Sequence, residues 1–196
     1  DSAYRLVGSE MCIRDRLEDG QFFLNYDFPK SIGYVAPFYG NFGVVLKAYA
    51  YILRLGGKGL TRATENAVLA ANYLRKRLDA VLEVPYDRVC MHEFVATACK
   101  QSTCGVRALD IAKMLLDKGY HAPTIYFPLI VKEALMFEPT ETESLDTLDQ
   151  FADDLIAILA ECEKDPAYAT GAPRTLPVTR LDETRAARNM ELTDDL

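Results

Sequence analysis

The feature that most constrains the fold is a long stretch of helical periodicity interrupted by two adjacent glycines. From Phe42 to Leu55 apolar residues recur at helical spacing, and Gly56-Gly57 end the run as a carboxy-terminal cap does. A second run of the same period extends from Leu60 to Leu82. The sequence therefore predicts two consecutive helices, each with an apolar stripe that must be covered by other parts of a protein.

Shorter segments on both sides of these helices alternate between strand and helix signals. Two further helices are expected over Val106–Lys118, closed by Gly119, and over Ser144–Lys164, capped by Thr142 or Ser144. Strands are expected from β-branched and aromatic content over Gln21–Tyr26, Val84–Tyr86, Glu93–Ala98 and Ala134–Phe137. This order predicts an α/β fold, more closely an α+β lobe with helices packed on a small, largely antiparallel sheet.

Charge and cysteine content exclude several classes of function. A net charge of -7 argues against nucleic acid or an anionic membrane as a partner, because both attract a basic face. No apolar run is long enough to span a bilayer, so a cytoplasmic protein is the default expectation. Five cysteines without CxxC spacing, and only two histidines, favour reduced thiols and predict no metal site.

The first residues do not share the character of the rest of the chain. Residues 5–16 read RLVGSEMCIRDR, which has no clean helical or strand period. The string is similar to the translation of a transposase adapter used in sequencing libraries. We therefore expect residues 1–16 to be an artefact that makes few contacts, with native sequence starting near Leu17 inside a longer gene.

Three separated strings carry a resemblance to a known family. They are PKSIGYVAPFYGNF at residues 29–42, PYDRVCMHEFV at 85–95, and DKGYHAPTIYFPLIVKEALMFEPTETES at 117–144. Their order and spacing resemble those of the second subunit of bacterial glycine decarboxylases, the P-protein family, over nearly all of residues 17–182. The segment ATACKQST at 96–103 and the last eight residues depart from the family pattern.

The resemblance implies a fold, a cofactor and partners. The family has an aminotransferase-like fold (fold type I), which gives residues 17–55 to the end of the large cofactor domain and the start of linking helices. Residues 56–165 are then the small domain, and residues 166–196 a surface-hugging or loose tail. The implied reaction uses pyridoxal phosphate to decarboxylate glycine and passes the aminomethyl group to the lipoyl arm of the H-protein, together with a first subunit.

The resemblance also implies that the Schiff-base lysine lies upstream, because no lysine here has the family's His-Lys-Thr context. Catalytic and cofactor-binding residues are therefore left unassigned, and the chain alone is expected to be inactive. Another fold type I enzyme, or a non-catalytic lobe that docks a partner, stays open as an alternative. In a truncated lobe, Tyr49, Tyr51 and Leu53 are expected to be more exposed than core residues.

Three residues are candidates to face an active site. His92 has the chemistry to steer a carboxylate or a proton, and the alternative is a hydrogen-bonded structural histidine near a domain junction. Tyr39 and Asn41 lie where a loop meets a helix, so Asn41 either caps that helix or contacts substrate or a partner.

Two other polar groups favour a structural interpretation. His121, with Pro123 and Thr124, reads as a rigid turn. Glu138, Glu141 and Glu143 are accounted for by the dipole of the helix expected after them.

Overall fold

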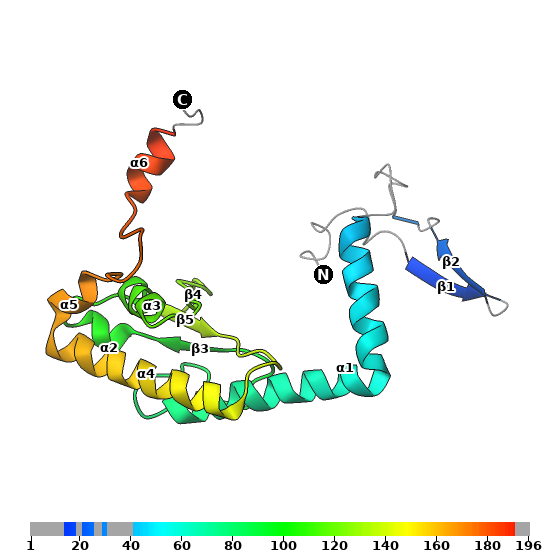
Figure 1. Ribbon diagram of the computed structural model, residues 1–196, viewed down its shortest axis with the longest axis horizontal. Helices are drawn as coiled ribbons and strands as arrows, with labels where there is room; N and C mark the ends of the chain where they lie inside the picture. The colour runs from blue at the N-terminus through cyan, green and yellow to red at the C-terminus, as the bar shows by residue number, and fades with distance from the viewer. Residues whose placement is uncertain (1–13, 19–20, 26–28, 31–40, 191–196) are drawn as a thin grey trace. The chain divides into compact units, whose positions relative to one another are not determined.

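The computed structural model describes residues 14–18, 21–25, 29–30 and 41–190 (Figure 1). The chain forms two compact units, Asp1–Leu60 and Thr61–Leu196. Helix α1 (Phe42–Leu78) contributes residues to both units. None of the helices in the described ranges is long and apolar enough to cross a membrane.

The first unit contains a two-stranded antiparallel ladder. Strand β1 (Arg14–Glu18) pairs with β2 (Gln21–Asn25), with Arg14 opposite Asn25 and Glu18 opposite Gln21. The expected strand at Gln21–Tyr26 is confirmed, and the last three of residues 5–16 pair with it although their sequence has no clean strand period. Pairing uses backbone N–H and C=O groups, which every sequence supplies, so it does not require a side-chain period. The proposed adapter origin of these residues stays a prediction.

Helix α1 is interrupted where the sequence predicted. Gly56 has φ 62° and ψ −179°, outside the helical region, so two helical stretches meet at this residue. A positive φ is readily adopted by glycine, which has no Cβ to clash with the backbone. The second stretch ends at Leu78, four residues earlier than expected, and turns follow it.

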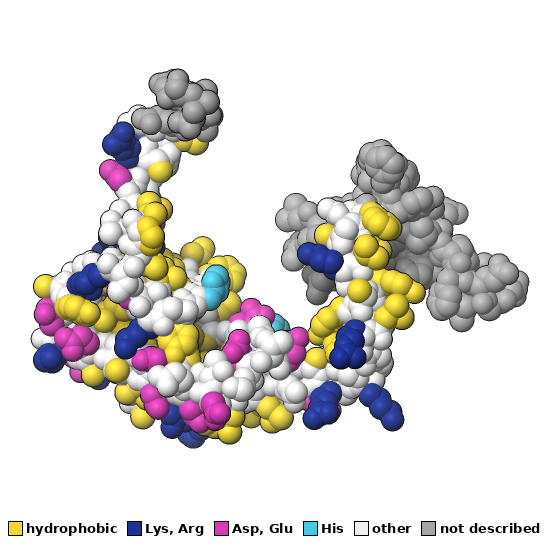
Figure 2. Space-filling model, viewed as in Figure 1, with side chains coloured by type: hydrophobic (Ala, Val, Ile, Leu, Met, Phe, Trp, Pro, Cys, Tyr) yellow, Lys and Arg dark blue, Asp and Glu magenta, His cyan; other side chains and the backbone are white. Residues whose placement is uncertain are grey.

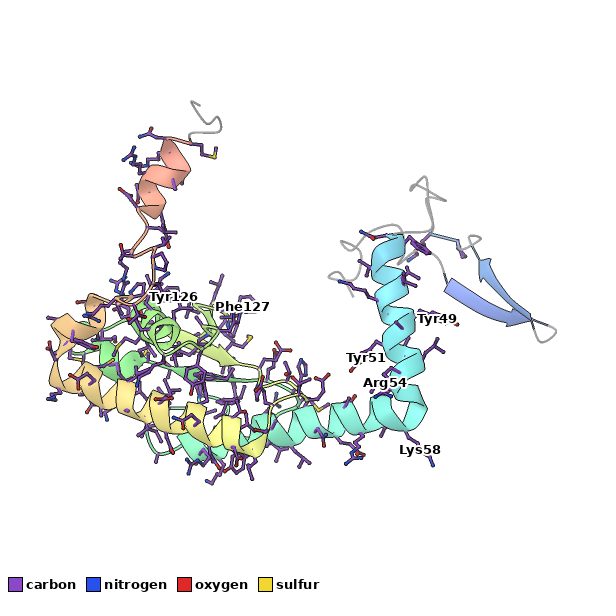
Figure 3. All side chains as sticks on the ribbon, viewed as in Figure 1. Tyr49, Tyr51, Arg54, Lys58, Tyr126 and Phe127 are labelled. Carbon is purple, nitrogen blue, oxygen red and sulfur yellow. The ribbon has the colours of Figure 1, made fainter. Side chains whose placement is uncertain are left out.

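The first stretch of α1 exposes large apolar side chains along its length, as Figure 2 shows in yellow. Tyr49, Tyr51 and Leu53 are 59%, 46% and 64% exposed, which confirms the expectation for these residues (Figure 3). On a helical projection at 100° per residue, the exposed apolar positions cover roughly 220° of the circumference. An arc this wide is typical of a helix enclosed by protein rather than lying on a surface.

The second unit is built on a three-stranded antiparallel sheet of order β3-β5-β4. Its strands are β3 (Phe94–Thr97), β4 (Thr124–Ile125) and β5 (Ala134–Phe137), with Phe94 opposite Phe137 and Ile125 opposite Leu135. This confirms the antiparallel α+β lobe and two of its expected strands. The strand expected at Val84–Tyr86 is wrong: only Glu83 bridges to Thr97 there, and Pro85 has no N–H to continue a ladder.

Helices cover this small sheet, which is too short to be stable alone. They are the second stretch of α1, α2 (Cys99–Ser102), α3 (Ala108–Asp117), α4 (Leu145–Lys164) and α5 (Pro166–Thr170), whereas α6 (Glu183–Arg188) has no buried residues. The second stretch of α1 runs beside α4 (Figure 1), and Arg77 forms ion pairs with Asp149 and Asp153 across this contact. The ion pairs are partly exposed and contribute little, so buried apolar contacts fix the two helices.

One apolar core unites these elements. It takes Leu74 and Leu78 from α1, with fully or nearly fully buried side chains from the sheet and the other helices. The larger of these are Phe94, Val106, Ile111, Leu115, Leu135, Phe137, Leu155, Ile158 and Leu159. Leu145, the first residue of α4, is exposed and does not belong to this core.

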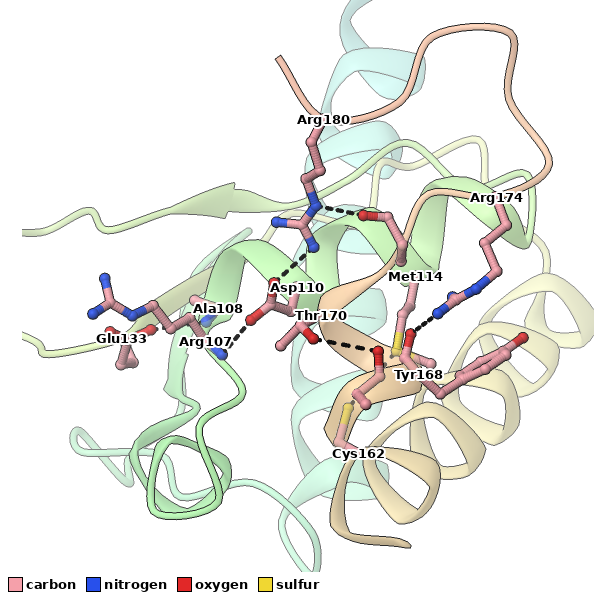
Figure 4. Close-up of polar contacts among 12 residues, drawn as sticks. Arg107, Ala108, Asp110, Met114, Glu133, Cys162, Tyr168, Thr170, Arg174 and Arg180 are labelled. Carbon is pink, nitrogen blue, oxygen red and sulfur yellow. Dashed lines mark hydrogen bonds and ion pairs between the residues drawn. The ribbon is translucent and has the colours of Figure 1, made fainter. Parts of the chain in front are cut away.

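The beginning of the tail is held against α3 by two aspartates that lie seven residues apart, on one face of the helix. Asp117 accepts hydrogen bonds from the backbone N–H groups of Arg174 and Thr175 and from the Thr175 hydroxyl, at 2.7 to 2.9 Å. Asp110 pairs with the Arg180 guanidinium at 2.7 Å (Figure 4). The segment up to Arg180 is therefore attached to the lobe rather than loose.

These bonds make a stability prediction that depends on pH. Burial raises the pKa of the Asp117 carboxyl, but the hydrogen bonds from Thr175 and Arg174 outweigh it and leave the pKa lowered. A lowered pKa stabilises the fold above the ordinary value near 3.9, and this contribution is lost as the pH falls through the folded value. We expect Asp117→Ala to lower the free energy of unfolding by about 1–2 kcal/mol at pH 7.

Denaturant unfolding between pH 7 and pH 3 checks this expectation. The difference between wild type and Asp117→Ala should shrink below about pH 4, where the carboxylate becomes protonated. Asp153→Ala is the matched control, since Asp153 makes an exposed ion pair with Arg77. This variant should lower the free energy of unfolding by less than about 1 kcal/mol. Equal losses for the two variants would contradict the proposed role of Asp117.

Candidate functional site

A pocket of about 360 Å³ opens in the second unit, between the loop after α3, the end of β5 and the start of α4. Its apolar lining includes Leu74, Phe137 and Phe151. Its polar lining includes His121, Thr124, Glu138, Thr140, Glu143 and Thr147. A concave apolar surface with a few convergent polar groups is the usual form of a small-molecule site.

Packed aromatic rings form the apolar side of the pocket. Phe137 stacks on Phe94 with ring centroids 5.2 Å apart, and meets Phe151 edge to face at 5.9 Å. Tyr120 also meets Phe151 edge to face, with ring centroids 5.1 Å apart. Rings in such contact lose little further freedom on ligand binding, so this wall is preorganised.

Tyr120 is fixed by a polar contact on α4. Its hydroxyl donates to Asp154 at 2.7 Å, and Asp154 also accepts from Gln150 and pairs with Lys118. Burial and the bond to Asp154 raise the pKa of Tyr120 to about 12. The hydrogen bonds from Gln150 and Tyr120 lower the pKa of Asp154. Tyr120 therefore stays a neutral donor at physiological pH and acts as a wall residue rather than a base.

His92 lies at the rim of the pocket instead of on its wall. Its Nε2 is 4.0 Å from Oε1 of Glu138, and both side chains are more than half exposed. His92 and the residues just before it lie outside strand β3, which begins at Phe94. Asn72 of α1 holds this segment, donating to the carbonyl of Cys90 at 2.7 Å and accepting from its N–H at 3.0 Å.

The structure brings together polar groups that the sequence analysis set aside as structural. His121 lines the pocket, together with Pro123 and Thr124. Glu138 and Glu143 also line it, and both precede α4, whose first turn contains Asp146 as its acidic residue. Glu143 directly precedes the Ser144 cap, where the helix dipole acts, whereas Glu138 lies six residues before the cap and is not accounted for in this way. The order of strands β4 and β5 would have been needed to foresee that residues 121 and 138 are neighbours.

The other two candidates, Tyr39 and Asn41, belong to the first unit. Asn41 caps α1: its carbonyl accepts from the N–H of Val45 at 3.0 Å, and its side chain accepts from the N–H of Val44 at 3.3 Å. The capping alternative is thus observed for Asn41, and a contact with substrate stays a prediction. Tyr39 lies outside the described residues.

The pocket does not have the donors that pyridoxal phosphate requires. Its lining contains two glutamates and no lysine or arginine, so it offers neither a Schiff-base amine nor cations for a phosphate. No group of histidine, cysteine and acidic residues suited to a metal occurs in the described part of the chain. What this pocket can supply is proton transfer and hydrogen bonding by His121 and Glu138, beside an apolar wall.

Comparison with solved structures identifies a protein that shares the fold of this chain. A crystal structure of the glycine decarboxylase (P-protein) of the glycine cleavage system, in inhibitor-bound form, matches with a TM-score of 0.55 and 17% identity. The match covers 74% of this chain and 34% of that one. The chain therefore shares the fold of about a third of that structure.

Sequence comparison identifies the family. The sequence model described as "Glycine dehydrogenase, C-terminal domain" matches residues 63–172. The chain is 56% identical over 172 residues to the probable glycine dehydrogenase (decarboxylating) subunit 2 of Caldanaerobacter subterraneus subsp. tengcongensis. It is 56% identical over 173 residues to the protein of the same description from Lysinibacillus sphaericus. The chain belongs to the glycine dehydrogenase family, in the region of its C-terminal domain.

The two alignments also define how much of those relatives the chain represents. Each covers 88% of this chain and 36% of the relative. The chain thus spans little more than a third of the length of the relatives it matches.

The Tyr120 contact is open to a direct test. We expect Tyr120→Phe to lower the free energy of unfolding at pH 7 by about 1 kcal/mol, the usual value of one hydrogen bond. The raised pKa implies that this contribution is present below the ordinary value near 10 and is lost as the pH rises through about 12.

Tyrosinate absorbance and denaturant unfolding measure the two effects. Tyr120→Phe should remove one ionisation near pH 12, whereas the exposed control Tyr86→Phe should change stability by no more than about 0.5 kcal/mol. A Tyr120→Phe protein with an unchanged high-pH titration would refute the assignment.

Proposed function

We propose that this chain is the carboxy-terminal part of the pyridoxal-phosphate subunit of a two-subunit glycine dehydrogenase (decarboxylating). The observation that carries the proposal is 56% identity over 172 residues to a relative described by that activity. The parent protein would decarboxylate glycine and pass the aminomethyl group to the lipoyl arm of an H-protein, together with its first subunit. The cofactor would supply the electron sink for the carbanion left by decarboxylation.

In this proposal the lobe is the small domain of a fold type I enzyme, and the cofactor site lies in the part of the relatives that this chain does not cover. The pocket supports this division, because its lining has acid–base groups and no anion-binding groups. The broad apolar face of residues 42–55 supports it as well, since such a face needs a large protein body to cover it.

His121 and Glu138 are the residues that we propose to face the reaction. A histidine changes charge near neutral pH and can move a proton between substrate and solvent. Glu138 lines the same pocket as His121, and its Oε1 is 4.0 Å from Nε2 of His92, so it can orient the imidazole of His92. His92 would then act through Glu138 as a positioning residue.

Glycine-dependent exchange of CO2 tests these roles in the full-length subunit with first subunit, pyridoxal phosphate and lipoylated H-protein. We expect His121→Ala to lower the exchange rate at least about tenfold, a barrier change near 1.4 kcal/mol. His92→Ala should have a smaller effect and should shift the pH profile, because its contact is with Glu138 rather than with the pocket interior.

The control is Glu163→Gln. Glu163 pairs with Lys100 near the other end of α4, about 24 Å along the helix from Thr147. The exchange rate of the Glu163→Gln variant should therefore equal that of wild type. If His121→Ala and Glu163→Gln behave alike, the pocket is not part of the site. If neither histidine variant changes the rate, both histidines are structural.

The 196-residue chain by itself should be inactive in the same assay. It has no lysine in the context that the family uses for the cofactor, and its pocket has no cationic lining. Added aldehyde will react with exposed lysines without specificity, so CO2 exchange rather than cofactor absorbance is the deciding measurement. Glycine-dependent exchange by this chain alone would overturn the proposed division.

A further inference from the structure

The segment that carries His92 joins α1 to β3 and has no regular secondary structure over residues 84–93. Its side chains from Pro85 to His92 are exposed, except that of Cys90, which is partly buried against the core. In the described part of the chain, no backbone–backbone hydrogen bond joins residues 85–92 to another element. Side chains of neighbouring elements must therefore hold this segment if it is to keep His92 in place.

Asn72, on the second stretch of α1, binds both backbone groups of Cys90. Its Nδ2 donates to the carbonyl of Cys90 at 2.7 Å, and its Oδ1 accepts from the N–H of Cys90 at 3.0 Å. Nδ2 also donates to the carbonyl of Val68, one turn earlier in the helix, at 2.8 Å. A carboxamide has two N–H donors on one end and an acceptor on the other, so these three bonds permit one orientation of the side chain.

A second contact from α1 reaches the same segment and is weaker. Arg75, which is three residues after Asn72 and on the same face of the helix, donates to Asp87. The Asp87 side chain is 72% exposed, and an ion pair with an exposed partner contributes little. Asp87 is also five residues from His92, whereas Cys90 is two residues from it. Asn72 is therefore the contact on α1 that can fix His92.

The sheet fixes the other end of the segment. Phe94, two residues after His92, is 4% exposed and lies opposite Phe137 in the ladder of β3 and β5. Glu138 follows Phe137 directly, so this antiparallel register brings Glu138 to the level of the residues just before Phe94. The Nε2 of His92 is accordingly 4.0 Å from Oε1 of Glu138.

Both anchors are needed to place the imidazole. His92 lies midway between Cys90, which is bound to α1, and Phe94, which is bound in the sheet. Without the bonds from Asn72, the residues before Phe94 would extend from the sheet as an exposed segment with free backbone dihedrals. The contact between His92 and Glu138 would then be one of many conformations.

We propose that Asn72 is a positioning residue for the reaction, which fixes the backbone before His92 and so sets the contact of His92 with Glu138 at the rim of the pocket. This inference rests on the proposed function, in which His92 acts through Glu138. It extends the site to a residue that does not line the pocket, and it gives the helix of the linking region a role in the chemistry.

The thiol of Cys90 reports whether Asn72 holds the segment. In the full-length subunit, we expect Asn72→Ala to increase the rate at which an aromatic disulfide reagent labels Cys90 at least about tenfold, because the partly buried thiol is released with its backbone. Cys162 is fully buried on α4, so its labelling should stay as slow as in wild type. Mass spectrometry of the labelled peptides separates the two thiols.

Either of two labelling results would overturn the inference. An unchanged rate at Cys90 would mean that Asn72 does not hold the segment. Faster labelling of both Cys90 and Cys162 would mean that Asn72 stabilises the whole lobe rather than placing His92.

Glycine-dependent exchange of CO2 tests whether this placement matters for the reaction. Asn72→Ala should lower the exchange rate by about the same factor as His92→Ala, and should shift the pH profile in the same direction. The variant with both changes should match His92→Ala alone, because the effect of Asn72 acts through His92. Asn66→Ala is the matched control: Asn66 is an exposed asparagine on the same stretch of α1, and its variant should exchange as wild type does.

The same preparations keep this inference apart from the proposed function. Wild type that exchanges CO2, with Asn72→Ala at the wild-type rate, disproves the positioning role alone. Additive losses in the double variant disprove it as well, and so does an unchanged rate for His92→Ala, since Asn72 then has no reacting residue to place. Wild type without glycine-dependent exchange disproves the proposed function, whatever the labelling of Cys90 shows.

Discussion

The register of strand β5 is the constraint on which the rest of the second unit depends. This strand of four residues, Ala134–Phe137, is hydrogen-bonded on both edges, with β3 on one side and β4 on the other. The pocket begins at its carboxyl end, at Glu138, and the loop from β4 ends at its amino end, at Glu133. A slip of one residue would exchange the faces of the strand and displace both features at once.

The sequence was sufficient to predict the elements with strong periodicity. Helix α3, helix α4 with its Ser144 cap, the strand at Ala134–Phe137 and the interruption at Gly56 all follow from local chemistry: apolar spacing, a side-chain cap and glycine backbone freedom. Ser144 caps α4 with its side chain, because its hydroxyl accepts a hydrogen bond from the N–H of Thr147 at 3.1 Å. Such signals act over one or two helical turns, so they can be read without knowledge of the fold.

The candidate site was less accessible to sequence reasoning, because it is assembled from segments far apart in the chain. His121 and Glu138 line one pocket only after β4 and β5 form an antiparallel pair, and two-residue β4 leaves almost no pattern in the sequence. His92 was singled out for its chemistry and lies at the rim, whereas His121 was assigned to a turn and lies on the wall. The residue type indicated acid–base chemistry by a histidine. Strand pairing determined that His121, and not His92, lies on the wall of the pocket.

The way Asp117 holds the tail has a consequence for sequence variation. Two of its hydrogen-bond donors are the backbone N–H groups of residues 174 and 175, which exist whatever side chains those positions bear. Because Asp117 binds these main-chain N–H groups, position 117 itself must be acidic. Any residue except proline, which lacks the N–H, can supply the two backbone donors. Among relatives, an acidic residue at position 117 can thus keep these backbone bonds while the side chains at positions 174 and 175 change.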